Sequence, residues 1–280
     1  MIKTICVCGA GTMGSGIAQV AAQSGFNTIQ YDISEAMLEK SRNSINANVD
    51  WLAGKQKIST NERDAILKRL QFSSDIRDCK ADLVIEAIAE QLNAKAALFN
   101  ELLEINLPST IYATNTSSIS ITAIQEQTTA PSRIAGLHFF NPAPVMKLVE
   151  IVKGKHTSDE VITELETVCR QMKKISVTCK DSPGFIVNRV ARPYYLEALR
   201  LIESGVAGFE DIDEIMEATG FKMGPFRLMD LIGIDINYSV SDIVWNALGK
   251  PARLTPSSIQ KQKTAEGKLG KKTGEGFYKY

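Results

Sequence analysis

Two ionisable side chains in the middle of the chain, His138 and Glu150, are of the types needed for acid–base chemistry. His138 lies near the end of a strand-like run over 133–141, and residues 146–152 form the next such run. Alternation along the second run puts Glu150 on an otherwise apolar face. A carboxylate buried there needs a partner, and His138 on the neighbouring run can supply it. A carboxylate that fixes the tautomer of a histidine is what a general base requires, although a single histidine is more often structural.

The opening of the chain carries a second chemical pattern, the glycine turn Gly9-Ala10-Gly11-Thr12-Met13-Gly14. The turn matches G-x-G-x-x-G between an apolar run at 2–8 and apolar residues at helical spacing over 17–21. Gly9 permits the tight turn, Gly11 lets a pyrophosphate approach the backbone, and Gly14 lets helix and strand pack closely. The positive end of the following helix favours phosphate. The alternative is a doubly wound domain whose turn binds nothing.

An acid closes this βαβ unit at the position where a ribose would lie. Residues 28–31 are predicted to form the second strand, and Asp32 follows directly. Its carboxylate can accept hydrogen bonds from both ribose hydroxyls and would repel a 2′-phosphate. Further along, Glu90 and Lys95 lie near the start of a helix that follows the strand-like run 82–89, and Asn115 to Ser118 follow the strand 110–114. Small polar residues at the carboxyl end of a strand predict a ligand rim.

The elements that position these residues alternate between strand and helix up to Asp181-Ser182-Pro183-Gly184, and only helices are predicted beyond. Between the second and third strands, Ser34 can cap one helix and Thr60 another, around a basic break at 51–59. The sequence therefore predicts an α/β fold: a Rossmann-like doubly wound sheet with an inserted helical hairpin, followed by an all-α C-terminal domain. The domains are predicted at 1–183 and 184–280. Helices are expected at 185–203, 210–219, 225–248 and 256–268.

Composition excludes several classes of function. Lys plus Arg equals Asp plus Glu at 32 each, so nothing indicates a nucleic-acid or membrane surface. No apolar run is long enough to span a bilayer, and residues 1–10 lack a cleavage pattern, so no signal peptide is expected. The five cysteines form no ligand spacing with the two histidines. A reducing cytoplasm, small core cysteines and no metal are expected.

Assembled in order, these pieces resemble an L-3-hydroxyacyl-CoA dehydrogenase, of the single-function 3-hydroxybutyryl-CoA dehydrogenase kind. The matching segments span essentially the whole chain, and HFFNPAPVMKLVE followed by PGFIVNR is far more specific than the glycine turn. The other matches are CGAGTMGSGIAQ, EAIAEQLNAK, ATNTSS, MGPFRLMDLIGID and GKLGKKTGEGFYKY. The match weakens over 221–223 and around Arg227.

The resemblance implies roles for particular residues. His138 matches the catalytic base, Glu150 its orienting carboxylate, and Ser117 and Asn188 the residues that hydrogen-bond the 3-oxygen of the substrate. Lys55 falls where the helical hairpin of the family touches a CoA phosphate. The implied cofactor is NAD, and the implied contacts are those of the glycine turn (Gly9, Gly11, Thr12, Met13 and Gly14) together with Asp32, Ala87, Glu90, Lys95 and Asn115.

The resemblance also implies a CoA-thioester substrate and a homodimer formed through the helical domain after residue 184. The predicted reaction is NAD-dependent oxidation of (S)-3-hydroxyacyl-CoA to 3-oxoacyl-CoA and its reverse. Two alternatives stay open from the residues. One is a dehydrogenase of a free hydroxy acid or sugar acid, which would not need Lys55, and the other is a nucleotide-binding protein without turnover. Longer or dicarboxylic acyl chains are a further alternative within the family.

We expect the protein to prefer NAD(H) to NADP(H). Asp32 repels a 2′-phosphate, and Ile33-Ser34-Glu35 offers no arginine to receive one. The measurement is kcat/KM for the two cofactors with the same substrate at one ionic strength. Equal values would contradict the role given to Asp32.

Overall fold

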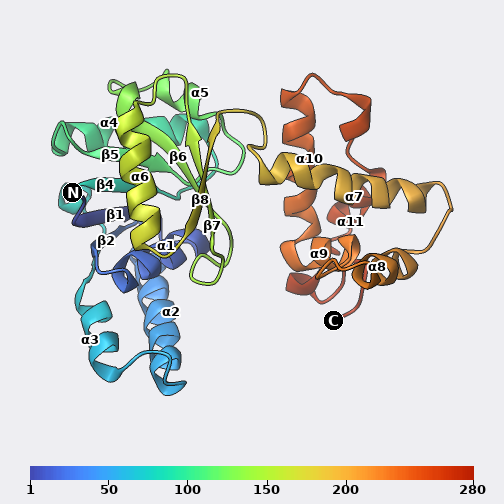
Figure 1. The fold of residues 1–280 in the computed structure, drawn as a ribbon, viewed down its shortest axis with the longest axis horizontal. Helices are drawn as coiled ribbons and strands as arrows, with labels where there is room; N and C mark the ends of the chain where they lie inside the picture. Colours follow the sequence, from blue (N-terminus) through green and yellow to red (C-terminus); the bar gives the residue numbers. More distant parts are fainter. The chain divides into compact units, whose positions relative to one another are not determined.

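A computed structural model describes all residues, 1–280, as two compact units, Met1–Ser182 and Pro183–Tyr280. The first unit is built on one eight-stranded sheet in the order β3-β2-β1-β4-β5-β6-β7-β8 (Figure 1). All neighbouring strands are parallel except β6 and β7, which pair antiparallel. The strands are β1 (Thr4–Cys8), β2 (Asn27–Tyr31), β3 (Leu70–Ser73), β4 (Leu83–Glu86), β5 (Ile111–Thr114), β6 (Ile134–Phe139), β7 (Leu148–Lys153) and β8 (Ile175–Lys180).

Helices cover both faces of this sheet, which confirms the predicted Rossmann-like class. The main ones are α1 (Thr12–Gln23), α2 (Glu35–Gly54), α3 (Thr60–Lys68), α4 (Leu92–Ile105), α5 (Ile121–Gln125) and α6 (Asp159–Gln171). Two short 3-10 turns, η1 (Ile76–Asp78) and η2 (Pro131–Arg133), precede β4 and β6. Polar side chains fix where several helices begin: Ser34 caps α2, and Ser158 caps α6 through its Oγ.

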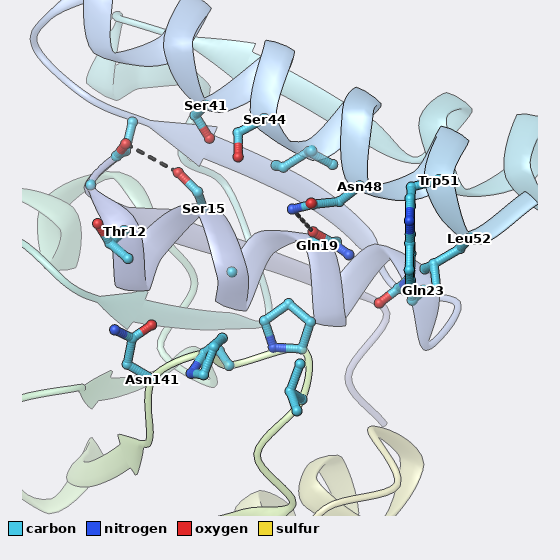
Figure 2. Close-up of a pocket in the computed structure, with 18 of the residues that line it drawn as sticks. Thr12, Ser15, Gln19, Gln23, Ser41, Ser44, Asn48, Trp51, Leu52 and Asn141 are labelled. Atoms are coloured by element: carbon cyan, nitrogen blue, oxygen red, sulfur yellow. Dashed lines mark hydrogen bonds between the residues drawn. The ribbon is translucent and has the colours of Figure 1, made fainter. Parts of the chain in front are cut away.

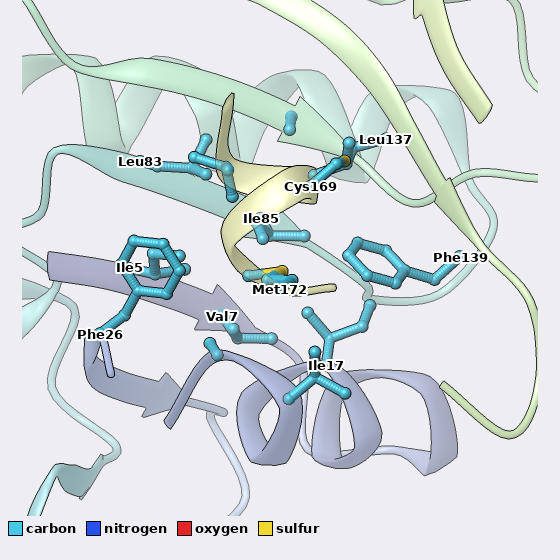
Figure 3. Packing of buried hydrophobic residues seen from close by; sticks show 14 of the residues in the cluster. Ile5, Val7, Ile17, Phe26, Leu83, Ile85, Leu137, Phe139, Cys169 and Met172 are labelled. Atoms are coloured by element: carbon cyan, nitrogen blue, oxygen red, sulfur yellow. The ribbon is translucent and has the colours of Figure 1, made fainter. Parts of the chain in front are cut away.

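Alternation along β1 divides its side chains between two layers. Ile5 and Val7 pack with Ile17 of α1 and with Cys169 and Met172 at the end of α6, as Figure 3 shows. Cys6 and Cys8 face the opposite layer. That layer contains Phe99 of α4 and Tyr112 of β5, whose rings meet edge to face at 5.6 Å. The inner strands β1, β4, β5 and β6 are buried on both faces, as expected for a parallel sheet, whereas the edge strands β3 and β8 are partly exposed.

The inserted hairpin of α2 and α3 extends away from the sheet (Figure 1), but its limits differ from the prediction. Residues 51–54 continue α2 rather than opening the break, and Ser59, not Thr60, caps α3. Ser59 and Glu62 form a capping box, with Ser59 N–H donating to Glu62 Oε2 at 2.7 Å. The short edge strand β3 was not predicted, because its residues read as the end of the preceding helix.

The second unit is entirely helical around a core of its own. It contains α7 (Val187–Glu203), α8 (Phe209–Ala218), α9 (Pro225–Ile232), α10 (Ile234–Ala247) and α11 (Ser258–Ala265), with short turns η3 (Ala252–Leu254) and η4 (Lys271–Thr273). The prediction of one helix over 225–248 was wrong. Gly233 has a φ of 104°, which ends α9 and lets the chain restart as α10.

Two buried carboxylates tie the end of the chain to these helices. Asp213 of α8 accepts hydrogen bonds from Phe226 N–H and Arg227 N–H at the start of α9 and from the Tyr278 hydroxyl. Asp230 of α9 accepts from the backbone of 277 and 278 and from the hydroxyl of Tyr280. The last four residues are thus part of the packed unit. No helix anywhere in residues 1–280 has the length and apolar character needed to cross a membrane.

Candidate active site

The turn after β1 has the shape that a dinucleotide requires. Gly9 has a φ of 107°, and a Cβ there would lie 2.5 Å from the backbone oxygen of Ala87. A Cβ on Gly14 would lie 1.9 Å from the backbone oxygen of Gly9, so this glycine allows α1 to start close to β1. A Cβ on Gly11 would meet nothing within 4 Å, and no side chain caps the start of α1. The backbone beside Gly11 therefore fits the approach of a pyrophosphate.

Asp32 lies beside this turn at the carboxyl end of β2. Its Oδ2 accepts a hydrogen bond from Ala10 N–H at 2.7 Å, and its Oδ1 accepts from Ser34 N–H at 2.9 Å. These two bonds fix the carboxylate in place. Each carboxylate oxygen can accept more than one hydrogen bond, so Asp32 keeps the capacity to bind ribose hydroxyls.

His138 and Glu150 face each other across the only antiparallel pair of the sheet. They are register partners in β6 and β7, and His138 Nδ1 lies 2.7 Å from Glu150 Oε2. His138 is 6% exposed and Glu150 is 1% exposed. With a carboxylate at Nδ1, the neutral ring carries its proton on that nitrogen and presents Nε2 as the acceptor. The predicted neighbourhood of the two side chains is therefore confirmed, while their part in catalysis stays a prediction.

A polar loop follows β5 next to this pair. Asn115 Oδ1 accepts from Phe139 N–H at 2.8 Å, which joins the ends of β5 and β6. Glu90 holds the following residues: its Oε1 accepts from the Thr116 hydroxyl, from Ser118 Oγ at 2.9 Å and from Ser117 N–H at 3.2 Å. Glu90 thus fixes the backbone of the loop that carries Ser117.

Glu90 is supported in turn by a buried ion pair. Lys95 Nζ lies 2.6 Å from Glu86 Oε1 and 3.2 Å from Glu90 Oε2, and Lys95 and Glu86 are 1% and 0% exposed. Burial opposes the ionisation of Glu90, but Lys95 and the hydroxyls of Thr116 and Ser118 outweigh it and lower the pKa of Glu90. Contact of Lys95 with the cofactor stays a prediction. In the structure, Lys95 holds the carboxylate of Glu90 through an ion pair.

Glu86 is a site residue that the sequence analysis assigned no role. Besides Lys95 it accepts hydrogen bonds from Ile88 N–H at 2.7 Å and from Thr114 Oγ1 at 2.7 Å. The sequence does contain a pattern that predicts this role for Glu86, because an acid at the end of an apolar strand must be paired when that strand is buried. The lysine that pairs with it follows nine residues later in the chain.

A cavity of about 820 Å³ opens between α1, α2 and the loop Asn141–Val145 (Figure 2). Its lining contains two cations, Lys40 and Lys57, and no acid. Lys55, the predicted CoA contact, is absent from the lining. The polar floor includes Gln19 and Asn48, joined by a hydrogen bond of 3.2 Å, and Trp51 of α2 lines one end.

Lys174 holds the loop that forms one side of this cavity. Its Nζ donates to the backbone oxygens of Ala143 at 2.6 Å and Met146 at 2.8 Å. Partial burial lowers the pKa of Lys174. These two hydrogen bonds hold in place the loop that joins the strands of His138 and Glu150.

Asn188, the remaining predicted site residue, belongs to the second unit. It lies in the first turn of α7, and its backbone oxygen accepts from Arg192 Nε at 2.9 Å. Arg192 is buried, and desolvation lowers its pKa to about 10. This bond fixes the backbone at the start of the helix that carries Asn188.

A doubly wound sheet, an open glycine turn and an acid after β2 together define a dinucleotide-binding protein. The chain matches family models along its length: residues 4–182 match the 3-hydroxyacyl-CoA dehydrogenase NAD binding domain, and residues 184–280 match the C-terminal domain of the same name. The chain therefore belongs to the 3-hydroxyacyl-CoA dehydrogenase family of NAD-dependent oxidoreductases. The expected family and the expected cofactor, NAD, are confirmed.

The chain is also similar to known proteins over its full length. It is 48% identical over 279 residues to the 3-hydroxyadipyl-CoA dehydrogenase of Escherichia coli, covering 99% of this chain but only 59% of that protein's length. It is 44% identical to the mitochondrial hydroxyacyl-coenzyme A dehydrogenase of Rattus norvegicus, covering 100% of this chain and 92% of the relative. The solved structure of (S)-3-hydroxybutyryl-CoA dehydrogenase from Ralstonia eutropha superposes with a TM-score of 0.96 at 38% identity, covering 100% of this chain and 99% of that one.

We expect Glu86→Gln to lower the free energy of unfolding by about 3 kcal/mol, because it removes one partner of a buried ion pair. Urea unfolding of the whole chain measures this change. Asp50→Asn is the matched control, since it removes one of the two carboxylates that pair with Arg63 at the surface and should cost much less. Equal losses for the two variants would contradict the importance given to Glu86.

Proposed function

We propose that this protein catalyses the NAD-dependent oxidation of (S)-3-hydroxyacyl-CoA to 3-oxoacyl-CoA and the reverse reaction. The observation that carries the proposal is the buried His138–Glu150 pair, with Nδ1 and Oε2 at 2.7 Å, beside the rim of a dinucleotide-binding sheet. We propose 3-hydroxybutyryl-CoA and acetoacetyl-CoA as the substrate pair, in agreement with the name of the Ralstonia eutropha enzyme.

In the proposed mechanism, His138 is the general base. Its Nε2 accepts the proton of the 3-hydroxyl group while Glu150 keeps the other ring proton on Nδ1. Glu150 also stabilises the imidazolium that results. Bound NAD supplies the acceptor for the hydride that leaves C3. Ser117 donates a hydrogen bond to the 3-oxygen and stabilises the charge that develops on it. The same role for Asn188 rests on the family resemblance alone. In the reverse direction the imidazolium of His138 returns the proton to that oxygen.

The cavity between α1 and α2 supports a CoA thioester rather than a free acid. CoA carries phosphates, and the cavity offers Lys40 and Lys57 without a competing carboxylate. Its volume of about 820 Å³ is within the range of pockets that enclose a cofactor-sized molecule. The loop Asn141–Val145, which joins the strands of His138 and Glu150, lines the same cavity together with Gly11 and Thr12 of the glycine turn. The cavity therefore adjoins both the expected cofactor contacts and the strand pair that carries His138 and Glu150.

Two further features belong to the proposal. The name of the Escherichia coli relative, 3-hydroxyadipyl-CoA dehydrogenase, makes a dicarboxylic acyl chain the second candidate substrate.

We also propose that the second unit forms a homodimer. Its helices leave several large apolar side chains exposed, among them Val190 of α7, Leu231 of α9 and Ile236 of α10, and apolar helix faces are usually buried against a partner.

We expect Glu150→Gln to lower kcat with acetoacetyl-CoA and NADH by at least about 10²-fold, because an amide cannot stabilise the imidazolium. His138→Gln should be at least as damaging, and the double variant little worse, since both residues serve one proton transfer. NADH oxidation at 340 nm measures the rates, with free acetoacetate as the negative control and 3-oxoadipyl-CoA as the competing substrate. Additive losses would mean that Glu150 is only a structural acid. Full activity on free acetoacetate would exclude the CoA-ester assignment.

The two lysines of the hairpin can be distinguished by a matched pair of variants. The family resemblance points to Lys55 and the cavity lining points to Lys57, and both side chains are exposed. We expect Lys57→Ala to raise KM for acetoacetyl-CoA about tenfold, equivalent to about 1.4 kcal/mol of binding, and to leave KM for a pantetheine ester unchanged. A larger effect of Lys55→Ala on the CoA ester alone would return the phosphate contact to Lys55.

A further inference from the structure

Three cysteines of the first unit have no part in the proposed reaction, yet the fold brings their sulphur atoms together. Cys6 and Cys8 point to the same side of β1, with their Sγ atoms 3.9 Å apart. Cys79 joins them from the chain segment after η1, and all three Sγ atoms lie within 4.8 Å of one another. Each of the three side chains is 0% exposed. We refer to Cys6, Cys8 and Cys79 as the thiol cluster.

The thiol cluster is buried, but it lies only one short turn below the surface. Cys79 follows the 3-10 turn η1, and its neighbours in sequence, Asp78 and Lys80, are exposed. The backbone oxygen of Cys79 accepts from Asn106 Nδ2 at 3.0 Å, which holds the turn against α4. Cys79 is thus the member of the cluster that lies on a short connecting segment rather than in a strand.

The size and composition of the cluster favour a soft central atom that is bound by three sulphur ligands. Thiolates bind soft, thiophilic elements in preference to hard cations. Bonds of about 2.3 Å, as in zinc–thiolate sites, place three sulphurs around one central atom about 4 Å apart, close to the spacing observed. Zinc itself takes a fourth ligand in structural sites, and no histidine or carboxylate belongs to this group.

The net charge of the buried complex determines which oxidation state of a soft element fits the cluster. Three thiolates leave a net charge of −2 around a monovalent ion and −1 around a divalent ion, and burying an uncompensated charge is costly. Around a trivalent element the centre is neutral. Hydrogen bonds within the cluster lower the pKa of Cys79 and, together with burial, raise the pKa of Cys6 and Cys8, so Cys79 is the thiol that ionises most readily and forms the first bond.

We propose that Cys6, Cys8 and Cys79 form a binding site for trivalent arsenic, taken up as arsenous acid. In this reaction three As–O bonds break and three As–S bonds form. Each thiol loses its proton to one leaving hydroxide, and three water molecules are released. Arsenic stays trivalent and no sulphur changes its oxidation state, so neither an oxidant nor a reductant is needed. The neutral product joins β1 to the turn at Cys79 and stabilises the first unit against unfolding.

Native mass spectrometry of the full chain with an equimolar amount of arsenite tests the proposal. The expected result is one adduct whose mass increase is one arsenic atom less three hydrogen atoms, together with a raised Tm. Cys79→Ser should lose both effects. Cys169→Ser and Cys179→Ser are the matched controls and should keep them, because Cys169 and Cys179 lie outside the cluster.

Absence of the adduct from the folded protein, or its formation only in urea, would overturn the proposal. Loss of the adduct in Cys179→Ser but not in Cys79→Ser would do the same. If Cys79→Ser does not fold, X-ray absorption at the arsenic edge of the loaded native protein decides the question. Three sulphur neighbours and no oxygen are expected, and two sulphurs with one oxygen would contradict a three-cysteine site.

Discussion

Burial of carboxyl groups at the carboxyl edge of the sheet is the constraint on which the arrangement of the candidate site depends. Glu86 and Glu150 end up 0% and 1% exposed, and a carboxylate without partners in such a place costs several kcal/mol. Each is satisfied by a side chain that then cannot move independently. Glu150 orients His138, while Glu86 holds Lys95, and through Lys95 and Glu90 it fixes the loop that carries Ser117. The cost of desolvation thus determines the geometry of the side chains that are predicted to react.

The second unit uses the same physical principle for a structural purpose. Asp213 and Asp230 are almost fully buried and accept backbone and tyrosine hydrogen bonds from α9 and from the end of the chain. Close approach is possible because small residues face them: a Cβ on Gly224 would lie 2.2 Å from Asp213 Oδ1, and one on Gly276 would lie 2.1 Å from Asp230 Oδ1. The close packing of Asp213 and Asp230 therefore explains why the segments MGPF and TGEGF have glycine at positions 224 and 276.

Local patterns predicted those parts of the fold and site that depend on neighbours in sequence. The glycine turn, the acid after β2 and the alternation of β7 each lie within a short window, and the fold class and the His138–Glu150 contact followed from them. Contacts between distant segments were not predictable in this way. Cys79 meets Cys6 and Cys8 across a separation of about 70 residues in the chain, which no local pattern can reveal. The break at Gly233 was missed because an apolar helical pattern continues on both sides of it. Lys57 rather than Lys55 lines the cavity, a difference that depends on the path of the loop after Gly54 and not on the composition of that loop.

The antiparallel pairing of β6 and β7 also has a consequence for the order in which the protein is built. His138 and Glu150 are 12 residues apart in the chain, so bringing them together closes a short loop at a small cost in chain entropy. Contacts of low sequence separation form early, and domains fold as units as synthesis proceeds from the N-terminus. Every strand of the sheet precedes Pro183. The ribosome therefore delivers the His138–Glu150 contact, with its surrounding sheet, before it has made the helical unit that carries Asn188.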